Sequence, residues 1–262
     1  MKILSIQNNN AYSFQYKQKN MNFTSYRKEV FYNDVNGRTI ENLKHTTATW
    51  MLRKGPDWKK LTAFLAEKYR NVQKVNVYDY ACSNGSEAYT FLITMLNDCG
   101  YDITKKFTPV IAKDYDGGAI YRAQSGRIKL DADEISDIEN YTDGNFDRFF
   151  CSKYLDSKYN IRTWDVKPIL TTNVEYSVAD ILDDYKNIKP NNSVVFVRNF
   201  WPYLDLKDRE MLINGLFSQL GNNSLLITGI FDKNDPINKR PIDNDLLSAG
   251  FKKSKVDYVF EK

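Results

Sequence analysis

Histidine, cysteine and glycine are scarce in this chain, whose 262 residues include one histidine, three cysteines and 12 glycines. The cysteines lack the C-x-x-C spacing of zinc ligands and stand at positions Cys82, Cys99 and Cys151. Because His45 is the only histidine, the ligand set of a structural zinc site is missing, and we expect no metal. Thiols without a pattern are typical of a reducing compartment, so we expect a cytoplasmic protein.

Long apolar runs and phosphate-binding glycine motifs are also absent. No apolar run reaches the length of about 18 residues that a membrane span needs, so we expect none. The apolar stretch within residues 1–10 is too short for the core of a secretory signal. Neither G-x-G-x-x-G nor G-x-x-x-x-G-K-[ST] occurs, which disfavours dinucleotide and P-loop sites.

The net formal charge is +4, and the positive charge lies near the N-terminus. Residues 1–54 contain nine Lys and Arg against three Asp and Glu, whereas the rest of the chain contains 28 against 30. A basic segment can meet an acidic protein partner, although a solvated basic face explains the same composition. The basic residues form no run, so we expect no nucleic-acid partner, and we expect a monomer.

The most informative stretch is residues 75–97, which predict a strand, a loop and a helix in succession. Residues 75–78 alternate apolar and polar side chains, as a buried strand does. Residues 81–86 are a turn of small residues, and apolar positions from Phe91 to Leu96 follow at helical spacing. Such a loop lets a ligand approach the backbone and the helix N–H groups. A plain strand–turn–helix connection explains the same pattern.

Predicted strands and helices alternate along the rest of the chain. The predicted strands lie at residues 110–112, 174–178, 193–197, 225–227 and 256–260, and those at 110–112, 193–197 and 225–227 are apolar. This alternation predicts an α/β domain with a mostly parallel sheet and helices on both faces. Two helical pieces broken at Gly55-Pro56 are predicted over residues 46–69, and another helix around residues 133–141. Residues 161–173 resemble a hairpin that Pro168 confines to an edge or a turn.

Polar residues follow four of the predicted strands, where ligands bind in open α/β sheets. They are Glu87 after the small loop, Asp114, Asp180, and Arg198 with Asn199. A carboxylate after the second strand is placed to accept hydrogen bonds from ribose hydroxyls, and one after the third from an adenine amine. Without a polyphosphate cradle, this order predicts an adenosine-containing ligand. Taken singly, each acid is equally explained as an exposed loop carboxylate or a helix cap.

These segments resemble the CheR-type methyltransferases, S-adenosylmethionine-dependent enzymes that methylate chemoreceptor glutamates. Residues 78–93, YDYACSNGSEAYTFLI, resemble the family's A-x-S-x-G-E-E-P-Y-S. Residues 45–53 resemble its T-x-F-F-R just upstream, and residues 112–126 its D-I-D and A-R-x-G. Residues 178–182 resemble its N/D-L-L, and residues 197–204 its C-R-N-V-x-I-Y-F.

The resemblance implies a Rossmann-like class I methyltransferase domain over residues 46–262, preceded by an N-terminal extension over residues 1–45. It implies a small β-subdomain insert at about residues 150–173. The family's longer helical N-terminal domain, which docks the receptor, is replaced here by a short segment of different character. Chemoreceptors are therefore not implied as acceptors, and we expect the basic N-terminal segment to help choose the acceptor without binding the cofactor.

The resemblance also implies site residues. The methionyl end of S-adenosylmethionine would lie against the small loop and the segment before it, at Thr49, Arg53, Ala81, Ser83, Gly85 and Glu87. The rest of the site would be formed at the other strand ends, by Asp114 at the ribose, Asp180 and Ile181 at the adenine, and Arg198 and Asn199 closing the site. Catalysis would involve Arg53 and Tyr203. The alternative for Arg53 is an ion pair on a helix surface, and the alternative for Tyr203 is an aromatic side chain packed in the core.

The predicted chemistry is methyl transfer to a carboxylate oxygen, most simply that of a protein glutamate. Such an acceptor is ionised at neutral pH and needs no general base, so His45 is not expected to act in catalysis. Two other interpretations remain open. One is a non-catalytic S-adenosylmethionine-binding interaction module, and the other is a nicotinamide enzyme on a related sheet, which the missing glycine motif disfavours.

Overall fold

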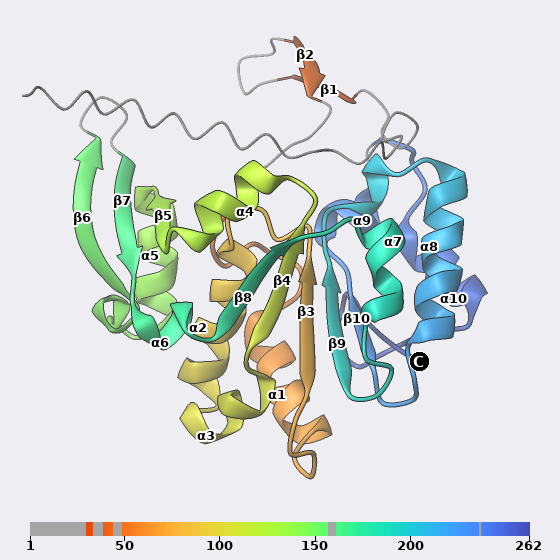
Figure 1. Cartoon of the computed structure of the whole chain (residues 1–262), viewed down its shortest axis with the longest axis horizontal. Helices are drawn as coiled ribbons and strands as arrows, with labels where there is room; N and C mark the ends of the chain where they lie inside the picture. Colours follow the sequence, from red (N-terminus) through yellow and green to blue (C-terminus); the bar gives the residue numbers. More distant parts are fainter. Residues whose placement is uncertain (1–29, 34–38, 44–48, 157–160, 236) are drawn as a thin grey trace, which may run out of the picture.

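The computed structural model describes residues 30–33, 39–43, 49–156, 161–235 and 237–262. Its centre is a seven-stranded sheet of order β11-β12-β10-β9-β3-β4-β8 (Figure 1). Five strands are parallel, namely β3 (Asn76–Tyr80), β4 (Val110–Asp114), β8 (Val174–Val178), β9 (Ser193–Val197) and β10 (Leu225–Ile227). Strands β12 (Val259–Glu261) and β11 (Lys252–Lys253) continue the sheet in antiparallel pairing. The predicted α/β fold with a mostly parallel sheet is confirmed.

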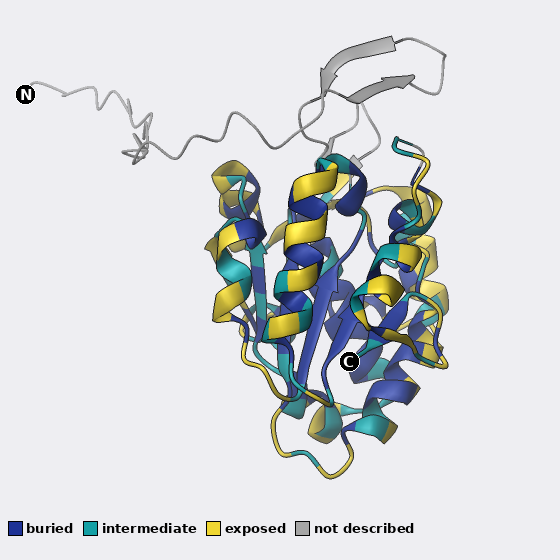
Figure 2. Ribbon diagram, turned by 90° about the vertical axis from the view of Figure 1, so that its right-hand side faces the viewer, coloured by how far each residue is buried: buried dark blue, intermediate teal, exposed yellow. Residues whose placement is uncertain are grey.

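Helices cover both faces of this sheet, and their outward sides are exposed (Figure 2). One apolar core contains Val77 of β3 and residues of α1 (Trp58–Lys68) and α2 (Ser86–Asp98). The other core contains Tyr78 and Tyr80 with residues of α7, α8 and α10. These helices span Ile181–Asp184, Leu206–Gln219 and Ile242–Ala249, respectively. Successive residues of β3 therefore point into different cores, as strand geometry requires.

A second, antiparallel sheet has the order β5-β7-β6 and lies beside α4 and α5 (Figure 1). Its strands are β5 (Arg127–Leu130), β6 (Phe150–Asp156) and β7 (Ile161–Val166), and α4 and α5 span Gly117–Gln124 and Ala132–Tyr141. The helix predicted around residues 133–141 is confirmed. The predicted hairpin ends earlier than expected, because Pro168 begins the short helix α6 (Pro168–Thr171), where a missing N–H costs nothing.

The first of the two helical pieces predicted over residues 46–69 is wrong within the described residues. Residues 49–57 form turns and bends, and α1 begins at Trp58 after the cap residue Asp57. Leu52 has a φ of 53°, which a right-handed helix does not allow, and its N–H donates to Oγ1 of Thr90. Tertiary partners thus replace the helical hydrogen bonds that the sequence pattern suggested.

Strands β1 (Val30–Asn33) and β2 (Thr39–Leu43) form a two-stranded antiparallel sheet. The remainder of the predicted extension, including His45, lies outside the described residues, so the division at residue 45 stays a prediction, as does the insert at about 150–173. Short helices complete the connections: α3 (Tyr101–Thr104), α9 (Ile230–Asn234), and 3₁₀ turns at Lys105–Phe107, Phe146–Arg148, Tyr185–Asn187 and Trp201–Tyr203. No helix in the described part of the chain is long and apolar enough to cross a membrane.

Candidate functional site

The carboxyl ends of four neighbouring parallel strands meet at one edge of the central sheet. In the order β9-β3-β4-β8, each strand pairs with the next, and β3, β4 and β8 point to the upper edge in Figure 1. The loops after these strands carry most of the residues predicted for the site. The sheet therefore brings together groups that are far apart in sequence, such as Glu87 and Arg198, which are separated by 111 positions.

The loop between β3 and α2 has an unusual backbone. Ala81, Ser83 and Gly85 all have a positive φ, of 59°, 53° and 88°. At Gly85 a side chain is excluded twice, because the left-handed φ disfavours it and a Cβ would lie 2.9 Å from Cζ of Tyr176, and closer still to its Oη. Helix α2 starts directly afterwards, at Ser86. The loop thus brings small residues with a left-handed backbone beside a helix N-terminus, as the sequence predicted.

Asp114 ties the end of β4 to this loop. One carboxylate oxygen accepts a hydrogen bond from the N–H of Ser83, and the other from the N–H of Asp116, each at 2.9 Å. The side chain is almost completely buried, with 8% of the residue exposed. Each oxygen has a second lone pair, so the carboxylate is fixed in place and can still accept from a ligand hydroxyl.

Arg198 follows β9 and links three segments. Its Nη1 lies 2.6 Å from Oε2 of Glu87 on α2, and its Nη2 and Nε donate to the carbonyl oxygens of Arg53 and Gly55 at 3.1 Å. The guanidinium also lies over the Trp58 ring, 5.2 Å from its centroid. The predicted pair Glu87 and Arg198 is therefore a buried ion pair beneath the loop.

Arg53 lies next to this pair, with Cζ 4.1 Å from the centroid of the exposed Trp50 ring. Burial and the positive charge of Arg198 lower the pKa of the half-buried Arg53. Two neighbouring guanidinium groups create a positive potential that favours the binding of an anion. The structure therefore places Arg53 beside Glu87 and Arg198, and its role toward a ligand stays a prediction.

Asp79 was missed by the sequence analysis, although it lies beside these residues. Asp79 lies on β3 and is 1% exposed, and its carboxyl group is close enough to that of Glu87 for the two groups to interact electrostatically. Burial and the neighbouring Glu87 raise the pKa of Asp79 well above its usual range. Burial also raises the pKa of Glu87, while Arg198 and Arg53 lower it. The available signal was an acidic residue in the middle of a central strand.

Asp232 was also missed, and it organises the loop after β9. Its carboxylate accepts hydrogen bonds from the N–H groups of Asn199, Phe200, Trp201 and Gly229 at 2.6–3.1 Å. Burial raises the pKa of Asp232 to about 7, although these four donors oppose the shift. No residue type near Asp232 in the sequence indicates this role, because three of its four donors come from a loop about 30 residues earlier.

Asn199 is fixed by the same loop and by α9. Its φ is 57°, and its side-chain oxygen accepts a hydrogen bond from the N–H of Phe231 at 3.1 Å. A Cβ on Gly229 would overlap the Asn199 amide group. The side chain of Asn199 therefore positions α9, and its predicted role in closing a ligand site stays a prediction.

The other predicted site residues lie at the same edge. Asp180 accepts a hydrogen bond from the N–H of Leu182 at 3.0 Å and caps α7, the alternative noted for a single acid, while the adjoining Ile181 is buried. Tyr203 is half-buried and stacks on Phe231, with ring centroids 5.7 Å apart. Thr49 is half-buried at the start of the segment that leads to Arg53. Their roles toward a ligand stay predictions.

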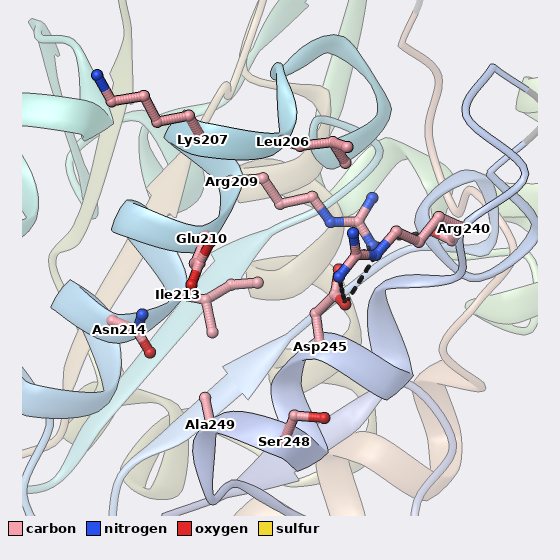
Figure 3. Close-up of a pocket in the computed structure, with 10 residues that line it drawn as sticks. All are labelled: Leu206, Lys207, Arg209, Glu210, Ile213, Asn214, Arg240, Asp245, Ser248 and Ala249. Carbon is pink, nitrogen blue, oxygen red and sulfur yellow. Dashed lines mark hydrogen bonds and ion pairs between the residues drawn. The ribbon is translucent and has the colours of Figure 1, made fainter.

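A cavity of about 490 Å³ lies away from this edge, between α8 and α10 (Figure 3). Asp245 pairs there with both Arg209 and Arg240, each at 2.7 Å. Arg209 also pairs with the buried Asp235 at 3.0 Å. These ion pairs connect α8 to α10 and to the loop before it, which is a structural role. Among the described residues, no group of three or more His, Cys, Asp or Glu is placed to hold a metal ion.

Comparison with known proteins identifies the family. Residues 47–244 match the family described as "CheR methyltransferase, SAM binding domain". The chain belongs to the CheR methyltransferase family. S-adenosylmethionine is accordingly its cofactor, and the resemblance inferred from the five sequence segments is confirmed.

Two relatives of this CheR domain are chemotaxis protein methyltransferases. The protein from Borreliella burgdorferi is 24% identical over 216 residues, which cover 79% of this chain and 72% of that protein. The protein from Salmonella typhimurium is 24% identical over 205 residues, which cover 74% and 68%.

Solved structures of methyltransferases resemble the CheR domain more remotely. A TehB-like SAM-dependent methyltransferase from Corynebacterium glutamicum is 12% identical with a TM-score of 0.41, covering 78% of this chain and 94% of that chain. A magnesium protoporphyrin IX methyltransferase from Synechocystis with bound SAM is 11% identical with a TM-score of 0.39, covering 78% and 76%.

The chemistry of the edge residues fits this cofactor. Three buried oxygens, both of Asp79 and Oε1 of Glu87, receive no hydrogen bond from an N–H donor of the described residues. Carboxylates of this kind suit the amino group of the methionyl end, and Asp114 suits the ribose hydroxyls. The CheR domain thus has buried acceptors of the kind that the ammonium and ribose donors of S-adenosylmethionine need.

Proposed function

We propose that this CheR domain transfers the methyl group of S-adenosylmethionine to a carboxylate oxygen, in the first place that of a glutamate in an acidic protein. The observation that carries the proposal is the half-buried Arg53 guanidinium beside Arg198. A planar guanidinium at that position matches a carboxylate in a two-point contact. We further propose that the protein works in the cytoplasm as a monomer, and that residues 1–54 attract the acidic partner.

The bound cofactor supplies a sulfonium-activated methyl group, so the chain itself supplies binding and orientation. Asp114 would hold the ribose, with Asp180 and Ile181 at the adenine. Glu87, fixed by Arg198, would take the methionyl amino group.

Arg53 would hold the acceptor carboxylate, and Tyr203, supported by its stack on Phe231, would hydrogen-bond at the reacting end. The carboxylate is already ionised at neutral pH, so no group has to remove a proton. Fixing the acceptor in line and excluding water would provide the rate gain.

The test is the chemical linkage in the product. The protein is incubated with methyl-labelled S-adenosylmethionine and glutamate-rich peptides, and the product is treated with mild base. A methyl ester releases volatile labelled methanol, and that result is expected. A base-stable label would instead indicate an amine or hydroxyl acceptor, and cofactor binding without any transfer would favour the non-catalytic interaction module.

Arg53→Ala is expected to reduce turnover about 100-fold or more, the scale on which misplaced reactants slow an enzyme, while leaving folding intact. Arg148→Ala is the matched control, because Arg148 is an exposed arginine that also lies over an aromatic ring, that of Phe149 at 5.4 Å. Equal activities of the two variants would remove Arg53 from the mechanism.

A further inference from the structure

Asp79 and Glu87 form a pair of carboxyl groups enclosed beneath the loop after β3. Asp79 is 1% exposed, and neither of its oxygens accepts from an N–H donor of the residues the structure describes. Oε1 of Glu87 is in the same situation, whereas its Oε2 pairs with Arg198 at 2.6 Å. Two carboxylates are both acceptors, so they hydrogen-bond to each other only through a shared proton.

The charged groups around Asp79 favour a state in which the Asp79–Glu87 pair carries one proton. Glu87 on α2 and Asp114 at the end of β4 are negative, and Arg198 after β9 is the positive neighbour. The Cys82 thiol and the Tyr176 hydroxyl also face Asp79, and burial raises the pKa of both above their usual range, so both stay neutral. Arg198 is already matched by Glu87, which leaves the second carboxyl group, Asp79, without a counter-charge.

We propose that Asp79 is protonated in the free protein, where its O–H group donates a hydrogen bond to Glu87. Asp79 releases this proton to the solvent when the positively charged cofactor binds. This proposal rests on the proposed function, because it places the methionyl end of the cofactor near Glu87. S-adenosylmethionine carries a sulfonium, an ammonium and a carboxylate, and so a net charge of +1. The demethylated product has lost the sulfonium charge and is neutral overall.

The step consists of breaking the O–H bond of Asp79. The proton passes to the solvent buffer, and the electron pair stays on the carboxylate, which then balances the added positive charge. A positive charge in a buried site favours the ionised form of a nearby acid, because the effective dielectric constant there is low. The neutral product stabilises the ionised carboxylate less, so Asp79 binds a proton again once the methyl group has been transferred.

Asp79 thereby acts as a positioning and charge-sensing residue, through Glu87, that separates cofactor from product. Since binding of S-adenosylmethionine releases a proton, its affinity should rise with pH, by at most about tenfold per pH unit. The affinity for S-adenosylhomocysteine should change less over the same range. The difference would help the spent cofactor to leave.

Isothermal titration calorimetry tests the proposal directly. Each ligand is titrated into the full chain at the same pH in phosphate and in Tris buffer, whose protonation enthalpies differ, so that the heats report the protons released. We expect about one proton for S-adenosylmethionine, clearly fewer for S-adenosylhomocysteine, and none for either ligand with Asp79→Asn. Asparagine keeps the size of the side chain and a donor for Glu87 but has no proton to lose.

Asp243→Asn is the matched control. Asp243 on α10 is also buried, has an oxygen without a hydrogen-bond donor among the described residues, and pairs with Lys253, outside the proposed site. It should release the same number of protons as the wild type. Equal release by Asp79→Asn and the wild type, or no release by a wild type that binds, would overturn the proposal.

Infrared spectroscopy of the free protein provides a second measurement. The carbonyl stretch of a protonated carboxylic acid should be stronger in the wild type than in Asp79→Asn, and equal bands in the two proteins would also overturn the proposal. The buried Asp232, whose pKa is raised to about 7, contributes to both spectra and cancels in their difference. If neither ligand binds, the proposed function fails and the proton release fails with it. The infrared band would then still decide whether Asp79 holds the proton.

Discussion

Nη1 of Arg198 lies 2.6 Å from Oε2 of Glu87, although the two residues are 111 positions apart. The same guanidinium donates to backbone carbonyl groups in the segment before α1. One buried side chain therefore connects the end of β9, the first turn of α2 and the segment that carries Arg53. The ion pair is a structural element of the proposed cofactor site, and its loss should affect folding as well as binding.

Arg198→Ala should destabilise the protein by about 3–5 kcal/mol, because it leaves Glu87 as a partly buried charge without its partner. Arg198→Lys should recover only part of this loss, since a lysine cannot make the divergent contacts of a guanidinium. Urea denaturation measures both variants. Wild-type stability in Arg198→Ala would show that the pair is not required.

Gly85→Ala should destabilise the protein by about 1–3 kcal/mol, the cost of a left-handed φ in a residue with a side chain, and should weaken cofactor binding. The added methyl group would also meet the Tyr176 ring. Combining Gly85→Ala with Tyr176→Phe should restore part of the stability, because the hydroxyl oxygen nearest to the new methyl group is removed. Strict additivity of the two substitutions in thermal unfolding would contradict this account.

Asp114→Ala should weaken binding of S-adenosylhomocysteine about tenfold or more, corresponding to 1.5–3 kcal/mol for hydrogen bonds to a charged group. It should also loosen the loop after β3, because the N–H of Ser83 loses its acceptor. Calorimetric titration measures the affinity. An unchanged dissociation constant would remove Asp114 from the cofactor site.

Asp79→Asn should alter the pH dependence of stability. In the unfolded chain Asp79 ionises above about pH 4, whereas burial raises its pKa in the folded protein, so the folded state binds more protons. Raising the pH through this window therefore favours unfolding of the wild type, by at most about 1.4 kcal/mol per pH unit.

The asparagine variant lacks this loss, so its stability relative to the wild type should increase between about pH 5 and pH 8. Urea unfolding across this range is the measurement, and Asp243→Asn serves as the control. Parallel curves for wild type and Asp79→Asn would mean that Asp79 has an ordinary pKa in the folded protein.

Deletion of residues 1–40 should leave the affinity for S-adenosylhomocysteine within a few-fold, because the segments with family motifs begin after this region. The deletion should reduce transfer to an acidic acceptor, since it removes most of the basic excess of residues 1–54. A truncated protein that folds and has lost cofactor binding would reassign the N-terminal segment to the cofactor site.

The fold could largely be predicted from local patterns. Strands β8, β9 and β10 occupy the predicted residues, and for β9 and β10 the signal was a short apolar segment, which is typical of a buried strand. Because the strands of a parallel sheet end at one edge, the sequence also predicted that Glu87, Asp114 and Arg198 lie at that edge. Patterns of this kind depend on neighbours in sequence, which is why they succeeded here.

The errors concern features that distant residues decide. Residues 49–57 have helical composition, but side chains from α5 and α2 bind their N–H groups, as Glu134 does for Met51 and Thr90 for Leu52. Asp79 and Asp232 were missed for the same reason. Asp232 accepts hydrogen bonds from a loop about 30 residues earlier. The pKa of Asp79 is raised only in the folded protein, where the side chain is buried beside Glu87.

The contact between Asn199 and Gly229 has a consequence for variation at these two positions. Because the Asn199 amide occupies the space of a Cβ at position 229, the two residues cannot change independently. A library randomised at both positions should return alanine or serine at 229 only in clones with a smaller residue at 199. Such clones would lose the acceptor for the N–H of Phe231, so selection for activity should keep the original pair together.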